Sequence, residues 1–143
     1  NTFYDLDKEV EKSFNLSIKD IFTEYGEDLF RKEENKLLKE LDMTSGLIVS
    51  TGGGIVLLEE NRTILKKHKT YFLEADIEDM YERAIKREND RPLLKGMDIT
   101  QFKDLYWKRR DLYLKSATTT INVEKKSIED LVTEITNNEK NII

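Results

Sequence analysis

The sequence predicts an α/β fold with a parallel sheet flanked by helices. Short apolar runs alternate along the chain with amphipathic segments of helical length, the order that a parallel sheet requires. One apolar run, Leu47-Ile48-Val49, is followed closely by Gly52-Gly53-Gly54, which holds three of the six glycines in the chain. Such a run is typical of a buried parallel strand, and ligands bind beyond the carboxyl ends of these strands. Because glycine lets a backbone approach a ligand closely, this loop is the first candidate for a binding site.

The composition indicates a single, soluble and highly charged domain. Of 143 residues, 38% are hydrophobic and 37% are charged, and no apolar run approaches the roughly 18 residues of a membrane span. The absence of cysteine excludes disulfides and thiolate metal sites and fits a reducing compartment, so we expect a cytoplasmic protein. A net charge of −5 argues against nucleic acid as the main partner, and we expect neither a membrane partner nor a secretory signal.

The expected strands are short apolar or β-branched runs separated by helical segments. In chain order they are residues 2–6, 47–50, 70–73 and 118–123.

Capping residues mark the ends of the expected helices. Ser17 with Asp20, and later Ser127 with Asp130, are N-cap signals, and Gly26 divides two helices. Another helix has acidic residues at its start and basic ones at its end, as the helix dipole favours. The expected helices are residues 8–14, 17–25, 27–41, 61–67, 76–87 and 100–116, with a last one from about residue 127.

Two acidic residues close the first expected strand. Asp5 and Asp7 flank Leu6, so that on a strand their carboxylates would lie on the same face. Two such acids can hold Mg²⁺ and accept a proton from a hydroxyl. The alternative is that Asp7 is a helix N-cap.

Two helices carry arginines suited to an anion. Arg31 and Glu34 are one turn apart, and the alternative is a surface ion pair that contributes less than about 1 kcal/mol. Farther along, Lys108-Arg109-Arg110 with Tyr113 offers a guanidinium fork that matches a carboxylate.

A polar stretch at about residues 88–98 is the candidate for a lid. It contains Arg91-Pro92-Leu93-Leu94, with the only proline of the chain, and Arg83 and Arg87 precede it. A lid over phosphates needs positive charge and apolar tips that exclude water. The alternative is a solvated run of charges.

In this order and spacing, the motifs resemble those of shikimate kinase over nearly the whole chain. The motifs that carry the resemblance are Asp5-x-Asp7, Ser17-Ile18-x-x-Ile21-Phe22, Gly26-Glu27, Phe30-Arg31-x-x-Glu34, the glycine triplet, Arg91-Pro92-Leu93-Leu94 and Arg109-x-x-x-Tyr113. The resemblance implies a three-layer fold of the P-loop kinase type and phosphorylation of the 3-hydroxyl of shikimate by ATP with Mg²⁺, on the route to chorismate and the aromatic amino acids. It also implies a protein that is a monomer when complete.

On the shikimate side, the resemblance implies one role for each residue. Asp7 would meet the reacting hydroxyl as its base, while Arg31 and Arg109 would bind the shikimate carboxylate. Glu34 would orient Arg31. The glycine triplet would line the ring, and Gly53 and Gly54 would offer backbone amides to its hydroxyls.

On the nucleotide side, the resemblance implies a metal-supporting acid and several cations. Asp5 would support Mg²⁺ through water, and Arg91 would reach the ATP phosphates from the lid. Either Arg83 or Arg87 would lie by the adenine, and Lys125 belongs to the adenine-side loop at residues 122–126.

Two departures from the family pattern are visible. Asp111 stands where the family usually has a proline, and the phosphate-binding motif Gly-x-x-x-x-Gly-Lys-Ser/Thr is absent from the chain. In the family, the strand before that motif lies between the strand that ends at the glycine triplet and the strand that ends near Leu73. We therefore expect residues 1–143 to be a shikimate kinase domain without its N-terminal strand, P-loop and helix, inactive and unstable by itself.

Two other functions are compatible with the same residues. One is a shikimate-kinase-like binding protein without catalysis, which the missing phosphate loop favours. The other is a related small-molecule kinase acting on gluconate or a nucleotide. The convergence of two arginines on one carboxylate favours shikimate over a nucleoside.

Overall fold

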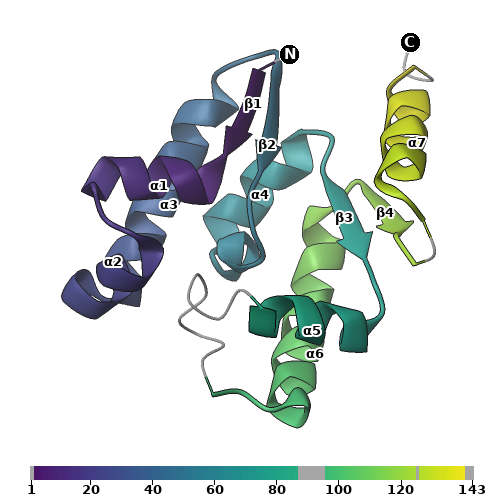
Figure 1. Ribbon diagram of the computed structural model, residues 1–143. Coiled ribbons are helices and arrows are strands. Elements are labelled where there is room, and N and C mark those ends of the chain that lie inside the picture. Colours follow the sequence, from purple (N-terminus) through teal and green to yellow (C-terminus); the bar gives the residue numbers. More distant parts are fainter. Residues whose placement is uncertain (1, 87–95, 125, 141–143) are drawn as a thin grey trace.

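Two pairs of parallel strands organise the fold of the computed structural model, which describes residues 2–86, 96–124 and 126–140 (Figure 1). β1 (Thr2–Asp5) pairs with β2 (Leu47–Ser50), and β3 (Tyr71–Glu74) pairs with β4 (Thr119–Asn122). The arrows of β1 and β3 point the same way in Figure 1, so the loops that follow both strand pairs leave on one side. The helical elements are α1 (Leu6–Phe14), α2 (Ile18–Tyr25), α3 (Glu27–Asp42), the 3₁₀ helix η1 (Gly54–Leu57), α4 (Glu59–Lys67), α5 (Ile77–Lys86), α6 (Ile99–Ser116) and α7 (Ile128–Lys140).

The α/β class and the order of the elements are confirmed, and their described ends lie within about two residues of the expected positions. The N-cap signals are also confirmed: the Ser17 hydroxyl accepts from the Asp20 amide at 3.2 Å, and the Ser127 hydroxyl accepts from the Asp130 amide at 3.0 Å. These bonds satisfy backbone donors that a helix leaves free in its first turn.

The junction of β1 and α1 differs from its prediction. Asp5 ends the strand and caps the helix, because its Oδ1 accepts from the amides of Asp7 at 3.1 Å and Lys8 at 3.4 Å. Asp7 therefore lies in the first turn of α1 and not on a strand beside Asp5. The prediction of a shared strand face is wrong, and so is the alternative that Asp7 is the cap.

Within the described part of the chain, β2 and β3 do not pair, and the two strand pairs form separate sheets. This agrees with the expectation that these strands are not neighbours in the family fold. Both strands also carry an exposed apolar side chain: Ile48 of β2 is 55% exposed and Leu73 of β3 is 46% exposed.

Two apolar clusters hold most of the buried apolar side chains of the described residues, and Val49 of β2 packs against the larger one. The larger one contains Leu6, Leu38, Ile55, Val56, Ile64 and Leu65, and the smaller one contains Val10, Ile21 and Phe30. Each fully buried side chain of this kind contributes about 1.5–3 kcal/mol of transfer free energy. Because η1 contributes Ile55 and Val56 and contacts α3, α4 and α6, the larger cluster fixes the segment that directly follows the glycine loop.

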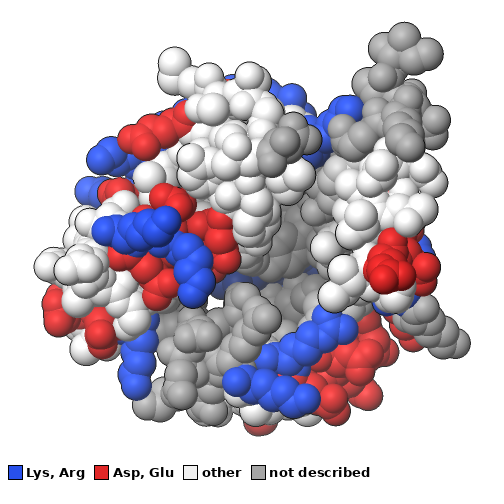
Figure 2. All heavy atoms as spheres, turned by 45° about the horizontal axis from the view of Figure 1, so that its top comes forward, with Lys and Arg blue, Asp and Glu red and all other residues white. Residues whose placement is uncertain are grey.

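Basic and acidic side chains are mixed on the described part of the face of the molecule shown in Figure 2, where they lie next to one another. Among the described helices, none is long and apolar enough to cross a membrane.

Candidate active site

The glycine loop is in contact with a side chain from each of three elements. A Cβ atom built on Gly52 would lie 3.2 Å from Asp7 Oδ2, and one built on Gly53 would lie 2.9 Å from the Tyr113 hydroxyl. One built on Gly54 would overlap the Arg31 guanidinium, with Nη2 at 2.6 Å and Cζ at 2.7 Å. The triplet thus allows α1, α3 and α6 to bring Asp7, Arg31 and Tyr113 against one short backbone segment.

Gly52 also has a conformational reason to be glycine. Its φ of 71° is in the left-handed region, where a Cβ is unfavourable. The turn that directs the loop past Asp7 therefore depends on this residue.

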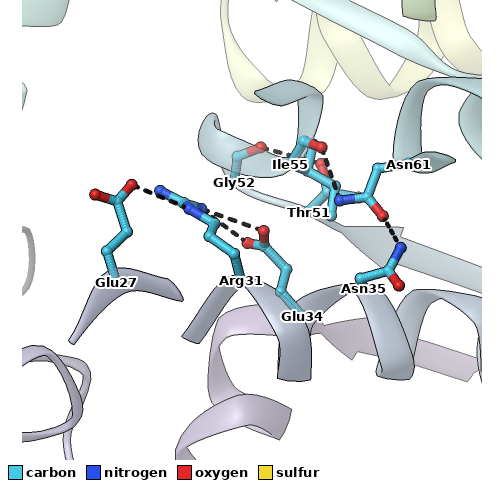
Figure 3. A network of polar contacts seen from close by, with 8 residues as sticks. All are labelled: Glu27, Arg31, Glu34, Asn35, Thr51, Gly52, Ile55 and Asn61. Carbon is cyan, nitrogen blue, oxygen red and sulfur yellow. Dashed lines mark hydrogen bonds and ion pairs between the residues drawn. The ribbon is translucent and has the colours of Figure 1, made fainter. Parts of the chain in front are cut away.

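Helix α3 presents a buried ion pair to the loop. Arg31 Nη1 donates to both carboxylate oxygens of Glu34, at 3.2 and 3.3 Å, and Arg31 Nε donates to Glu27 at 3.4 Å (Figure 3). Glu34 is only 1% exposed, and the Arg31 side chain is 13% exposed. The surface-pair alternative is wrong, because two largely desolvated charges belong to a different energetic class from exposed ones.

The pKa of the Glu34 carboxyl is influenced by charged groups from three helices. Burial raises the pKa of the Glu34 carboxyl, because desolvation disfavours the charged form. The positive charges of Arg31 and Arg109 act in the opposite direction on this pKa, and the negative charge of Asp7 adds to the rise. Residues from α1, α3 and α6 therefore act on one buried carboxylate.

Helix α6 contributes Arg109 with an unused donor. Within the described residues, Arg109 Nε is buried and has no hydrogen-bond partner. A buried donor without a partner costs about 1–3 kcal/mol, so this guanidinium could form a further hydrogen bond with an acceptor. The contact of α6 with η1 places this helix beside the glycine loop.

The neighbouring Arg110 has a different partner. Its Nε donates to Glu74 Oε2 at 2.7 Å, and the Tyr106 hydroxyl donates to the same oxygen at 3.1 Å. The hydrogen bond from Arg110 lowers the pKa of Glu74. The two adjacent arginines of the predicted carboxylate-binding cluster therefore have different surroundings. Arg110 is bonded to Glu74 at the end of β3, whereas the charge of Arg109 acts on Glu34.

The predicted nucleotide-side residues are less completely described. Arg83 lies on α5 and is exposed, and Asp5 caps α1 through one carboxylate oxygen. Arg87, Arg91, Lys125 and most of the predicted lid lie outside the described residues. In the described ranges, no group of three or more His, Cys, Asp or Glu side chains is arranged to hold a metal ion.

The polar support behind the glycine loop is a feature that the sequence patterns did not predict. Asn61 of α4 is fully buried, and it shares a helix face with Ile64 and Leu65 at spacings of three and four residues. An amide among apolar residues on one helix face is a sequence signal that could have predicted this support. A polar group that is buried on such a face requires specific hydrogen-bond partners.

The parallel strand pairs, with Asp7 of α1, Arg31 of α3 and Arg109 of α6 gathered at the glycine loop after β2, are typical of an α/β protein of the P-loop kinase type. The family model described as shikimate kinase matches residues 1–139. The chain belongs to the shikimate kinase family.

Relatives and solved structures agree with this assignment. The chain is 38% identical over 131 residues to a shikimate kinase of Clostridium botulinum, covering 90% of this chain and 76% of that protein. It is 44% identical over 112 residues to the bifunctional shikimate kinase/3-dehydroquinate synthase of Thermotoga maritima, covering 78% of this chain and 22% of that protein.

Two solved structures are similar over nearly the whole chain. The shikimate kinase of Acinetobacter baumannii in complex with shikimate has a TM-score of 0.89 and 30% identity, covering 99% of this chain and 81% of that one. The shikimate kinase of Aquifex aeolicus has a TM-score of 0.81 and 37% identity, covering 97% and 81%.

Proposed function

We propose that this protein transfers the γ-phosphoryl group of ATP to the 3-hydroxyl of shikimate, a step in chorismate and aromatic amino acid biosynthesis. The observation that carries the proposal is the convergence of Arg31, Glu34, Arg109 and Asp7 around the glycine loop. Membership in the family supports it, as does the likeness to a shikimate kinase in complex with shikimate.

Arg31 and Arg109 bind the shikimate carboxylate in this proposal. Glu34 holds the Arg31 guanidinium by two hydrogen bonds, which reduces its freedom before the substrate arrives. A carboxylate would provide the acceptor that Arg109 Nε lacks, as a charge-assisted hydrogen bond. The glycine triplet then lines the ring, and Gly53 and Gly54 offer amides to its hydroxyls.

Asp7 is the proposed base and orients the reacting hydroxyl. As the hydroxyl oxygen bonds to the γ-phosphorus, the bond from that phosphorus to the β,γ-bridging oxygen breaks and ADP leaves. The hydroxyl proton passes to the Asp7 carboxylate. Asp7 lies next to Gly52, so the base and the ring-lining loop face the same space.

The nucleotide side is proposed in less detail. Arg91 stabilises charge on the phosphates, either Arg83 or Arg87 lies by the adenine, and Lys125 belongs to the adenine-side loop. Asp5 keeps one carboxylate oxygen outside its capping bonds, which fits a water-mediated contact to Mg²⁺ held mainly by phosphates. When bound, this ion neutralises charge that develops on the phosphates. We also propose a monomer in the cytoplasm.

The test is ADP production by the complete gene product with Mg²⁺ and ATP. We expect turnover with shikimate and none above background with gluconate or a nucleoside monophosphate. Shikimate binding by calorimetry without ADP production would favour a non-catalytic binding protein. Turnover with gluconate or the nucleotide alone would refute the substrate assignment.

A further inference from the structure

Side chains of α4 support successive carbonyl groups of η1. Asn61 Nδ2 donates to the Ile55 carbonyl at 3.0 Å. Arg62 Nη1 donates to the Val56 carbonyl at 2.7 Å and to the Leu57 carbonyl at 3.3 Å. The last carbonyls of a helix lack partners within that helix, so these donors meet a real requirement.

Asn61 connects η1 to α3 through a second bond. Its Oδ1 accepts from Asn35 Nδ2 at 2.7 Å, and its side chain is 0% exposed (Figure 3). Both ends of the buried amide are therefore used, one toward each element. We call the chain of bonds from Asn35 through Asn61 to Ile55 the asparagine relay.

The asparagine relay joins the two elements that must meet accurately in the site. Asn35 directly follows Glu34 on α3, the helix that also carries Arg31. Ile55 directly follows Gly54, the glycine against which the Arg31 guanidinium packs. Hydrogen bonds are directional and sensitive to distance, whereas apolar contacts tolerate small displacements.

We propose that Asn61, bonded to Asn35, is a positioning residue that sets the distance between the Arg31 guanidinium and the glycine loop. Neither amide touches the reacting atoms in this inference, which rests on the proposed function. The asparagine relay maintains the geometry in which Arg31 and the loop amides bind one shikimate molecule together. Its loss raises the shikimate KM more than it changes the ATP KM.

The test compares Asn61→Asp, Asn35→Ala and Ile121→Ala in the complete gene product. Asn61→Asp keeps the side-chain size but places an oxygen against the Ile55 carbonyl, and Asn35→Ala removes the other bond. Ile121→Ala is the matched control, because Ile121 is a buried residue of β4 that belongs neither to the asparagine relay nor to the apolar cluster that contains Ile55. The measurements are KM for shikimate and for ATP, and amide hydrogen exchange in a peptide covering residues 51–58.

We expect both asparagine variants to raise the shikimate KM about threefold to tenfold, the equivalent of one net hydrogen bond. The ATP KM stays within about twofold, and exchange in residues 51–58 becomes faster. Ile121→Ala lowers the melting temperature while the shikimate KM stays within about twofold. If Asn61→Asp does not fold, Asn35→Ala decides the question, because it acts at the partly exposed end of the asparagine relay.

Two negative results have separate meanings. An active wild-type enzyme whose asparagine variants keep the wild-type shikimate KM, or raise the shikimate KM and the ATP KM equally, would overturn the inference alone. A wild-type protein without shikimate-dependent turnover would overturn the proposed function, and the inference about shikimate affinity with it.

Discussion

The two strand pairs are surrounded by different kinds of polar group. Around β1 and β2, Glu34 and Asn61 are almost fully buried and have specific partners. Around β3 and β4, the main ion pair joins Glu74 and Arg110, whose side chains are 24% and 31% exposed. Helix α5, on this second side, has no buried side chain among its described residues.

This difference indicates where the protein holds a fixed arrangement of charges before its ligand arrives. Burying a charge is costly unless partners hold it, so buried charges occupy defined positions. Donors and charges fixed in advance need no rearrangement during binding or reaction. The buried groups around the first strand pair are thus fixed in advance, and substitution of the residues that face the glycine loop should affect substrate binding and turnover.

The largest expected effect is at Asp7. Asp7→Asn should lower kcat about 10²-fold or more, because asparagine cannot accept the hydroxyl proton. The melting temperature should change by only a few degrees, since Asp5 and not Asp7 caps α1. The measurements are ADP production at saturating shikimate and Mg²⁺–ATP, and thermal unfolding.

Glu9→Gln is the control for Asp7→Asn. It removes a carboxylate from the same helix, where Glu9 pairs with Lys12 at 3.2 Å at the surface. It should keep the wild-type kcat. Near-normal turnover of Asp7→Asn would exclude Asp7 as the base.

The next largest effect separates two adjacent arginines. Arg109→Ala should weaken shikimate binding about 10-fold to 150-fold, because a charge-assisted hydrogen bond contributes about 1.5–3 kcal/mol. Arg110→Ala, which breaks the bond to Glu74, should leave the shikimate Kd within about twofold. Calorimetric titration of each variant with shikimate and with ATP gives the comparison. Equal losses for both ligands in Arg109→Ala would contradict the assignment.

A smaller effect is expected from Gly54→Ala. Gly54 lacks the left-handed backbone that demands glycine, so alanine there causes no backbone strain, and its methyl group mainly displaces the Arg31 guanidinium that Glu34 holds beside the loop. We expect the shikimate Kd to rise about threefold to tenfold, the equivalent of one net hydrogen bond, with little loss of stability.

Gly46→Ala is the control for Gly54→Ala, and its expected effects on stability and on shikimate affinity are the reverse. Gly46 has a φ of 75° and open space around its Cβ position, so alanine there strains the backbone without touching the site. It should lower stability by about 1–2 kcal/mol and leave shikimate affinity unchanged. Reversal of the two outcomes would contradict the role assigned to the glycine loop.

The smallest effect concerns an exposed cluster at the ends of α3 and α4. Asp42 accepts from Lys67 at 2.6 Å and is 2.5 Å from His68 Nε2, and these hydrogen bonds lower its pKa below the ordinary 3.8. A lowered pKa means stability that is present above pH 3.8 and is lost as pH falls through the folded-state value.

Asp42→Asn should therefore flatten the acid side of the stability profile and change the melting temperature at pH 7 only slightly. Urea unfolding between pH 2.5 and 7 measures both parts. A large loss of stability at pH 7 would contradict the expectation that an ion pair at the surface contributes less than about 1 kcal/mol.

Features that depend on residues close together in the sequence, such as helix caps and side-chain pairs within one helix, could be predicted from the sequence. The Ser17 and Ser127 caps were readable because a cap depends on neighbours three residues away. The Arg31–Glu34 pair was readable from its helical spacing, but its burial was not, because burial depends on how α3 packs against distant elements.

Other features required information that spacing does not contain. Arg109 and Arg110 are adjacent, so composition alone does not distinguish the arginine near Glu34 from the one bound to Glu74. The shift of the cap to Asp5 reflects competition between strand and helix over a two-residue interval. Asn61 has partners 6 and 26 residues away, beyond the reach of a local pattern.

The direct passage from β1 to α1 has a consequence for insertions and deletions. Because Asp5 ends the strand and caps the helix, no loop separates the two elements. Loops ordinarily absorb changes in length, as residues 43–46 between α3 and β2 would. An α-helix turns about 100° per residue, so one residue inserted after Asp5 would rotate Asp7 away from Gly52 unless the cap moved with it. At this junction, chain length should therefore be more strictly constrained than residue type.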